Sequence, residues 1–135
     1  MMNARIAKEV VVRLADKPGT LANLARLIAD KGLNVLATCA WTEGDTAVLR
    51  FVTEDNLRVV DTFRDRKLNP QELEVVVAEL PHKVGMLRKL SDRLVERGVD
   101  IRHLYVTTTP DQQVSMVVLA TSNNERAVVA LNEKH

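Results

Sequence analysis

The chain has 135 residues, about one average domain or two small ones by the rule of roughly 150 residues per domain. This length leaves no room for a catalytic domain joined to a separate regulator. Nineteen basic and eighteen acidic residues give a formal net charge of +1, whereas a protein that binds a nucleic-acid backbone normally carries a basic excess. The single cysteine, Cys39, excludes an intrachain disulfide.

Hydropathy along the chain predicts its compartment. Residues 1–10 lack the apolar stretch of a signal peptide, and no run approaches the roughly 18 apolar residues that a membrane-spanning helix needs. We therefore expect a soluble, cytoplasmic protein that contacts no membrane.

The sequence contains one unit written twice. An offset of 66 residues places Gly19 over Gly85 and Gly32 over Gly98, and it needs no gap. Further identities pair Val10, Leu14, Thr42, Asp45, Val48 and Val52 with Val76, Leu80, Thr108, Asp111, Val114 and Val118. The alignment predicts two repeats, residues 1–69 and 70–135.

The first copy predicts a strand, a helix, a hairpin and a second helix. The Val-rich run 9–15 is typical of a strand. Leu21, Leu24 and Ile28 then form one apolar stripe on a helix, with Pro18 in its first turn and Gly32 as a left-handed stop. Strands at 34–42 and 46–53 form the hairpin, and residues 56–66 form the closing helix.

The second copy predicts the same order of elements. A strand at 74–80 precedes a helix striped by Leu87, Leu90 and Leu94. Strands at 100–108 and 114–121 follow, and the last helix runs over 123–133. Ser122 and Glu125 match a capping box at the start of that helix.

Two βαββα units predict an α+β fold, an antiparallel sheet with helices on one face. A ferredoxin-like unit needs a fourth strand, and the second copy has none of its own after its last helix. We expect the first strands of the two copies to pair, each acting as the other's fourth strand. The resulting order is 2-3-1-1′-3′-2′.

The alternation of side chains along a strand predicts which residues face away from the helices. We expect Val35, Ala37 and Cys39 on the core side. The outward set is Glu9, Val11, Arg13, Leu36, Ala40, Val48, Val52, Val75, Val77, Leu104, Val106, Met116 and Val118. A solvated face should be polar, so this aliphatic set favours a partner surface, most simply a second copy in a homodimer. The alternative is that the alternation is wrongly assigned in one strand.

The segment 16–21, between the first strand and the first helix, predicts a ligand site. Gly19 lets a ligand approach the backbone, and the amides after it point out of the positive end of the helix, which binds carboxylates and phosphates. Asn34 opens the next strand and offers an amide oxygen and an N–H. The helix start and Asn34 together suit the carboxylate and ammonium groups of an amino acid. The alternative is a tight turn that binds no ligand.

These residues resemble a known family. The sequence DKPGTLANLARLIADKGLNV (16–35) looks like the signature of the ACT domain, a small regulatory module, and PHKVGMLRKLSDRLVERGVDI (81–101) looks like a second, more diverged copy. The resemblance covers nearly the whole chain. It implies ferredoxin-like βαββα(β) repeats, pairing of modules, and allosteric binding of a small metabolite, usually an amino acid, where the loop of one domain meets another domain.

Carried over position by position, the resemblance implies ligand-binding residues in both copies. They are Asp16, Pro18, Gly19, Thr20, Leu21 and Asn34 in the first copy, and His82, Gly85, Met86, Leu87 and Asp100 in the second. The second loop departs from the pattern because Val84 replaces the proline and Asp100 replaces the asparagine. We therefore expect the first copy to hold the better site.

No motif in the sequence indicates catalysis. It contains no phosphate-binding glycine loop, nucleophile elbow or zinc-protease motif, and its histidines lack metal-ligand spacing. We predict no catalytic residue, no metal and no cofactor, and we expect Cys39 to be a buried, inert thiol.

Three functional classes remain to be compared. The first is an autonomous amino-acid sensor, and the second is a regulatory subunit that docks on a separately encoded amino-acid biosynthetic enzyme, like the small subunit of acetolactate synthase. The third is an RNA-binding protein, since RNA-recognition domains share this architecture. Those domains display aromatic side chains on the open sheet face, where this sequence predicts aliphatic ones, so we expect no nucleic acid partner.

Overall fold

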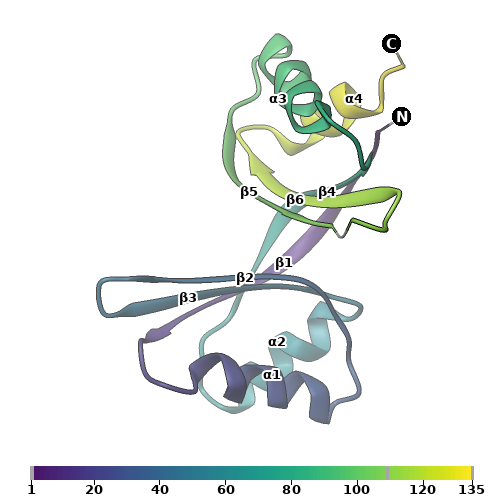
Figure 1. The fold of residues 1–135 in the computed structure, drawn as a ribbon. Coiled ribbons are helices and arrows are strands. Elements are labelled where there is room, and N and C mark those ends of the chain that lie inside the picture. The colour runs from purple at the N-terminus through teal and green to yellow at the C-terminus, as the bar shows by residue number, and fades with distance from the viewer. Residues whose placement is uncertain (1, 109, 135) are drawn as a thin grey trace. The chain divides into compact units, whose positions relative to one another are not determined.

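The structure is a computed structural model that describes residues 2–108 and 110–134. Its strands and helices follow the predicted order twice (Figure 1). They are β1 (Asn3–Ala15), α1 (Thr20–Asp30), β2 (Val35–Glu43), β3 (Thr46–Thr53), α2 (Asn56–Asp65), β4 (Gln71–Pro81), α3 (Met86–Glu96), β5 (Ile101–Thr107), β6 (Val114–Thr121) and α4 (Asn124–Asn132).

The strands form an antiparallel sheet in the order β2-β3-β1-β4-β6-β5. This confirms the predicted α+β class and the predicted order, in which the first strands of the two copies are neighbours. β1 is longer than the predicted 9–15 because its first residues serve the second copy.

Two compact units divide the chain, and their limits differ from the predicted boundary between residues 69 and 70. One is the contiguous unit, Lys8–Leu73. The other is the split unit, which joins the described residues up to Ala7 to those from Glu74 onward. Each unit takes its fourth strand from the other half of the chain: the split unit takes the start of β1, and the contiguous unit takes the start of β4.

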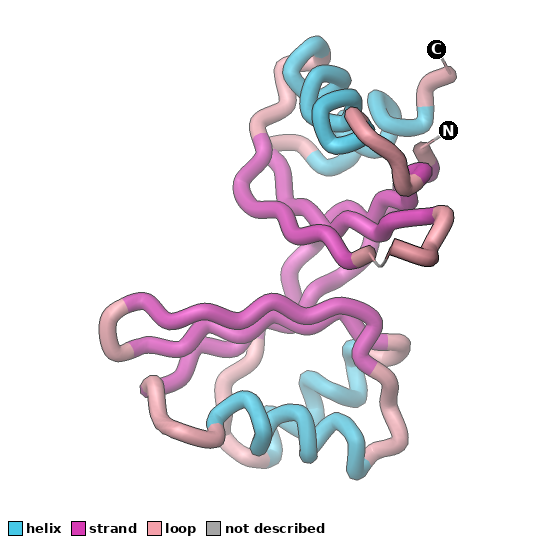
Figure 2. Tube along the Cα trace, in the orientation of Figure 1, coloured by secondary structure: helices cyan, strands magenta, loops and turns pink. Residues whose placement is uncertain are grey.

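In the contiguous unit, α1 and α2 cover one face of the strands, as Figure 2 shows. Alternate residues of β1 and β3 pack there against the apolar stripes of the helices. Phe51 of β3 and Phe63 of α2 meet edge to face with ring centres 6.1 Å apart. The buried members of this core are Val10, Val12, Leu24, Ile28, Ala47, Leu49, Phe51, Val59, Val60 and Phe63.

In the split unit, α3 and α4 pack on one face of β4 and β6 in the same way. Met2 and Ala4, from the start of β1, belong to this core. The Asn132 side chain at the end of α4 accepts a hydrogen bond from the Ala4 N–H (2.7 Å) and donates one to the Ala4 carbonyl (3.0 Å). The two ends of the chain therefore complete one hydrophobic core.

Two helix starts differ from prediction. Gly19 is the N-cap of α1, so Pro18 lies before the helix and not in its first turn. Asn123, not Ser122, caps α4, and its side chain accepts from the Arg126 N–H (3.0 Å). The Ser122 hydroxyl instead accepts from the Asp100 N–H (2.9 Å).

A register shift at the start of each hairpin reverses the predicted alternation in β2 and β5. The shifts fall between Val35 and Ala37 and between Ile101 and His103. An extra residue in a strand moves every later side chain to the opposite face. Ala40 consequently pairs with Leu49 on the helix-covered face, although it was predicted to face outward.

The other consequences of these shifts concern residues on both faces. Leu104 and Val106 pair with Leu119 and Val117, on the helix-covered face, and Cys39 and Ala37 lie on the open face, so all four predictions are wrong. Trp41, His103 and Tyr105 also lie on the open face, which is not purely aliphatic. His103 and Tyr105 stack with ring centres 6.2 Å apart. The predicted aliphatic face is therefore no longer an argument against a nucleic-acid partner. The balanced net charge is the argument that remains.

The second hairpin is longer than the first, so the two copies do not align without a gap. Leu14 pairs with Ala47 in the contiguous unit, and Leu80 pairs with Ser115 in the split unit. The offset is 66 residues for the first strands but 68 for their partners. The pairs Asp45/Asp111, Val48/Val114 and Val52/Val118 are therefore not structural equivalents.

The predicted outward valines are not solvent-exposed. Val11, Val48, Val52, Val75, Val77 and Val118 are 0–5% exposed, and Glu9 is fully buried beside Arg50, with Glu9 Oε1 2.5 Å from Arg50 Nη1. The apolar patch on which the homodimer was predicted is thus largely absent from the surface. Leu36 is 44% exposed, and Met116 is half-buried.

Candidate functional site

The loop between β1 and α1 of the contiguous unit turns at Gly19. Gly19 has φ +86°, in the left-handed region, and a Cβ there would meet no atom within 4 Å. The Thr20 N–H and hydroxyl both donate to the Lys17 carbonyl, at 3.2 and 2.8 Å. The Asp16 N–H donates to the Asp45 carbonyl of the neighbouring hairpin (2.7 Å), which fixes the start of the loop.

The first turn of α1 has amides available for an acceptor. The Asn23 N–H donates to the Gly19 carbonyl (2.9 Å), which is the first bond of the helix. Within the described residues, the N–H groups of Leu21 and Ala22 donate to no protein acceptor. Such groups at the positive end of a helix attract an anionic oxygen.

A cavity of about 280 Å³ opens at this helix start. Asp16, Lys17, Gly19, Thr20 and Leu21 line it on the loop side. The hairpin supplies the rest of its wall: Ala40, Trp41, Thr42, Ala47 and Leu49. The cavity thus joins a carboxylate, an ammonium group and the helix start to a small apolar wall.

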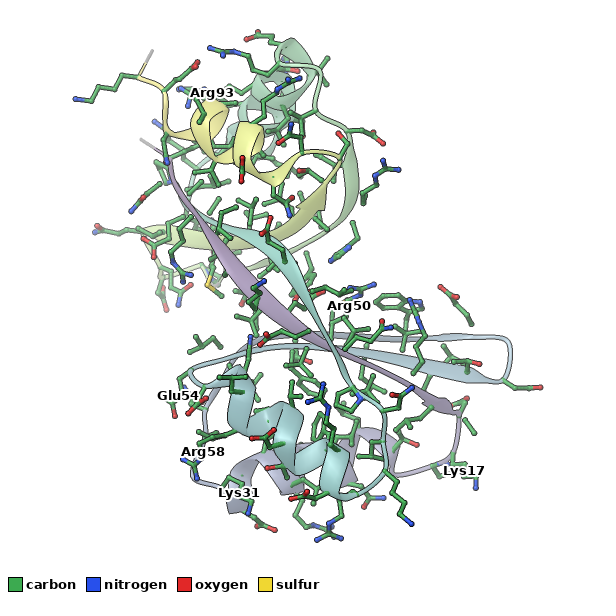
Figure 3. The ribbon with its side chains drawn as sticks, turned by 180° about the vertical axis from the view of Figure 1, so that it is seen from behind. Lys17, Lys31, Arg50, Glu54, Arg58 and Arg93 are labelled. Carbon is green, nitrogen blue, oxygen red and sulfur yellow. The ribbon has the colours of Figure 1, made fainter. Side chains whose placement is uncertain are left out.

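Asn34 does not reach this cavity within the contiguous unit. Its N–H donates to Glu54 Oε1 (3.0 Å), at the opposite end of β2 from Trp41. Seven residues of strand at about 3.3 Å each separate the two ends by roughly 23 Å. Figure 3 shows Glu54 and Lys17 at opposite ends of this unit. Asp16, and not Asn34, is therefore the polar side chain beside Gly19.

The matching corner of the split unit is crossed by a side chain. His82, at the position of Asp16, has its Nδ1 atom 3.1 Å from the Ser115 hydroxyl and 3.2 Å from the Thr108 hydroxyl. By strand register, Thr108 and Ser115 are the equivalents of Thr42 and Ala47, which line the cavity of the contiguous unit. The imidazole thus lies against the residues that correspond to Thr42 and Ala47 in the cavity wall of the first copy.

The remaining predicted residues of the second copy are dispersed. Gly85 repeats the left-handed N-cap with φ +87°, and Leu87 is 52% exposed. Met86 is 7% exposed and belongs to the core of the split unit. Asp100 opens β5 and is held through its N–H by Ser122, as Asn34 is by Glu54.

Sequence reasoning missed Lys17 and the hairpin residues of the cavity, above all Trp41. The Trp41 Nε1–H donates to Glu43 Oε1 (2.8 Å), and the Arg50 guanidinium lies 5.3 Å from the centre of the indole ring. The register of the hairpin would have identified Trp41, because Trp41 pairs with Val48, and Val48 lies beside the end of β1 where the loop begins.

No group of three or more His, Cys, Asp or Glu side chains is placed to hold a metal ion in the described part of the chain. Among the described helices, none combines the length and apolarity needed to cross a bilayer.

Comparison with known proteins gives matches only among solved structures. No family model and no curated protein matches the sequence. Protein BT0572 from Bacteroides thetaiotaomicron is 26% identical with a TM-score of 0.87, over 96% of this chain and 88% of that one. The ligand-free regulatory subunit of aspartate kinase from Thermus thermophilus is 12% identical with a TM-score of 0.69, over 96% and 93%.

A third structure, of aspartokinase alpha and beta subunits, is 18% identical with a TM-score of 0.67, over 96% of this chain and 94% of that one. These matches span both repeats and the exchanged strand. The chain has the tandem ACT-domain fold. The resemblance stated from residues 16–35 and 81–101 is therefore confirmed at the level of the fold.

Proposed function

We propose that this tandem ACT-domain protein is a non-catalytic regulator that binds a small metabolite, an amino acid, at the β1–α1 loop of its contiguous unit. The observation that carries the proposal is the cavity at the start of α1, where the amides of Leu21 and Ala22 have no acceptor among the residues that the structure describes. A ligand carboxylate accepts from these amides. The Asp16 carboxylate, on the same cavity wall, pairs with the ligand ammonium.

The size of the cavity supports a small ligand. About 280 Å³ lies just below the range of roughly 300–1,000 Å³ for sites that take drug-sized molecules. Charge-assisted hydrogen bonds contribute about 1.5–3 kcal/mol each, and micromolar affinity needs about 8 kcal/mol in all. Two or three such bonds and contact with the apolar hairpin wall supply a large part of that free energy.

The asymmetry between the two copies supports one site in each chain. His82 spans the corner of the split unit, whereas the corner of the contiguous unit is open. The proposal therefore keeps Asp16, Pro18, Gly19, Thr20 and Leu21 as the ligand-binding segment.

The family pattern places a ligand where two domains meet, and a second copy of the chain is the simplest source of a second domain. In such a homodimer, Asn34 of one protomer would approach the loop of its partner. Light scattering after size-exclusion chromatography measures this: a mass near 30 kDa supports the dimer, and the monomer mass of 15.1 kDa contradicts it.

Thermal unfolding in the presence of each of the twenty amino acids tests the ligand class. A ligand at 100 times its Kd stabilises the folded state by about 2.7 kcal/mol, which is readily measured as a rise in Tm. Gly19→Val should remove the rise, and Gly85→Val, with the same left-handed backbone in the split unit, should keep it. A rise that survives Gly19→Val would show that the ligand binds elsewhere.

A second candidate function is regulation of a separately encoded biosynthetic enzyme by docking. The Thermus thermophilus structure is described as a regulatory subunit of aspartate kinase, which favours this candidate. Helices α3 and α4 also expose Val95 (73%) and Val129 (59%). Co-purification of the tagged protein from its own cells with one biosynthetic enzyme, lost on Val95→Asp, would support docking over autonomous sensing.

A further inference from the structure

A second cavity, of about 660 Å³, runs along a different face of α1 in the contiguous unit. Its walls are the end of β1, the turns of α1, and the chain that follows α2. This volume falls well inside the range of roughly 300–1,000 Å³ that is typical of small-molecule sites. Of the ligand-binding residues predicted from the sequence, Thr20 alone lines this cavity, and it lines the first cavity as well.

The floor of this cavity is apolar. Leu24 is 2% exposed, and Leu14, Leu27 and Leu68 are partly buried against the same core. An opening onto four leucines favours a ligand that carries a hydrocarbon body, because burying apolar surface is the main gain of such a contact.

The backbone around Leu68 is held in an unusual conformation. Lys67 and Asn69, which flank it, have φ +60° and +52°, the left-handed region that side chains other than glycine seldom adopt. The Leu68 N–H donates to the Phe63 carbonyl (3.0 Å), which closes the last turn of α2 and fixes Leu68 on the cavity wall. Strain of this kind, held by the surrounding fold, is frequent at binding sites.

The rim of the cavity is cationic. Lys17, Arg26 and Arg66 line it, and none of the three forms a salt bridge with a described residue. Asp30 is the one acidic residue that lines the cavity among the described residues. Three cations from the β1–α1 loop, α1 and the segment after α2, with one carboxylate, line the same cavity and favour an anionic ligand.

We propose that this cavity binds a small organic carboxylate with an aliphatic or aromatic body. The acid group lies among Lys17, Arg26 and Arg66, and the body lies on the leucine floor. Such a ligand differs in class from the zwitterion proposed for the loop, which needs an anionic partner for its ammonium group. The proposal does not depend on the loop function.

Isothermal titration with sodium octanoate tests the proposal on the full chain. Octylammonium, with the same hydrocarbon body and the opposite charge, should bind at least about tenfold more weakly, since it faces three cations. Butanoate should also bind more weakly than octanoate, because it covers less of the leucine floor. Equal affinity for octanoate and octylammonium would overturn the assignment of an anion site.

Charge-removing variants locate the binding. Arg26→Gln with Arg66→Gln should weaken octanoate binding at least about tenfold, because the carboxylate loses two charge-assisted hydrogen bonds. Arg13→Gln with Arg64→Gln is the matched control, since it removes the same charge from exposed positions that do not line the cavity. Equal weakening by both pairs would show general attraction to a basic surface and would overturn the site.

One variant separates this proposal from the loop function. Trp41→Ala should leave octanoate binding within about threefold, whatever it does to amino acid binding, because Trp41 lines the loop cavity and not the second one. Loss of octanoate binding in this variant would mean that the loop is the octanoate site and would overturn the proposal. Failure of all twenty amino acids to bind, with octanoate binding retained, would overturn the loop function alone.

Discussion

Substituting alanine for Gly19 or Gly85 tests why a glycine stands at each helix start. The cost of the substitution can come from the backbone conformation or from steric overlap of the added Cβ. Gly19 and Gly85 have φ of +86° and +87°, and a Cβ at either position would meet no atom within 4 Å. The cost of Gly19→Ala or Gly85→Ala is therefore one of backbone conformation and not of steric overlap. An alanine in the left-handed region costs about 1–2 kcal/mol.

The unfolded state offsets part of this cost. Alanine has fewer unfolded conformations than glycine, which returns about 0.4–1 kcal/mol on folding. The net expectation is a destabilisation of about 0–1.6 kcal/mol for each variant, and the two values should agree within about 0.5 kcal/mol. Urea unfolding monitored by circular dichroism measures it as a change in midpoint at constant m.

Two results would refute this reasoning. A loss above about 3 kcal/mol in either variant would mean that the added Cβ meets packed atoms, as in an overpacked core. A large difference between Gly19→Ala and Gly85→Ala would mean that the two helix starts do not share one conformation.

Three further substitutions test the two cores and the corner of the split unit. Phe63→Ala should destabilise the protein by about 3–5 kcal/mol in urea unfolding, since Phe63 is fully buried, whereas Leu57→Ala, at a residue 68% exposed, should cost under about 0.5 kcal/mol. His82→Ala should cost about 0.5–1.5 kcal/mol through its hydroxyl partners, and Asp16→Ala, whose side chain forms no hydrogen bond or salt bridge with a described residue, should cost less in the same assay. Asn132→Ala should cost about 1–3 kcal/mol and speed amide exchange at the start of β1; unchanged exchange there would contradict its role as a tie.

The fold was predictable because local and repeated signals agreed. Glycines at 19, 32, 85 and 98 bound the first helix of each copy, and all four have positive φ. The pairing of the first strands of the two copies was expected from the ferredoxin-like pattern, and the strand order confirms that they are neighbours. The periodicity of the leucines identified the helices, since each buries one stripe on the sheet.

Strand faces and the hairpin offset were not predictable from alternation alone. A one-residue bulge before Ala37 carries no composition signal, yet it moves Cys39 and Trp41 to the open face. The longer turn of the second hairpin was also missed, because chance identities such as Val52 and Val118 let the two copies align without a gap.

The sequence indicated only one side of the candidate site. The loop around Gly19 and the preference for the first copy came from the sequence, and both stay predictions. The wall that includes Trp41 depends on hairpin register, which a motif of the loop does not contain. The separation of Asn34 from Gly19 depends on the length of β2.

The two units differ in whether their chain is continuous, and this bears on synthesis at the ribosome. All residues of the contiguous unit emerge by Leu73, so it can fold while the rest of the chain is still being translated. The split unit must wait, because its N-terminal strand meets partners as distant as Asn132, 128 positions later than Ala4. Until those residues are translated, the start of β1 lacks its partners. Its unpaired backbone N–H and carbonyl groups can then bind chaperones or other chains.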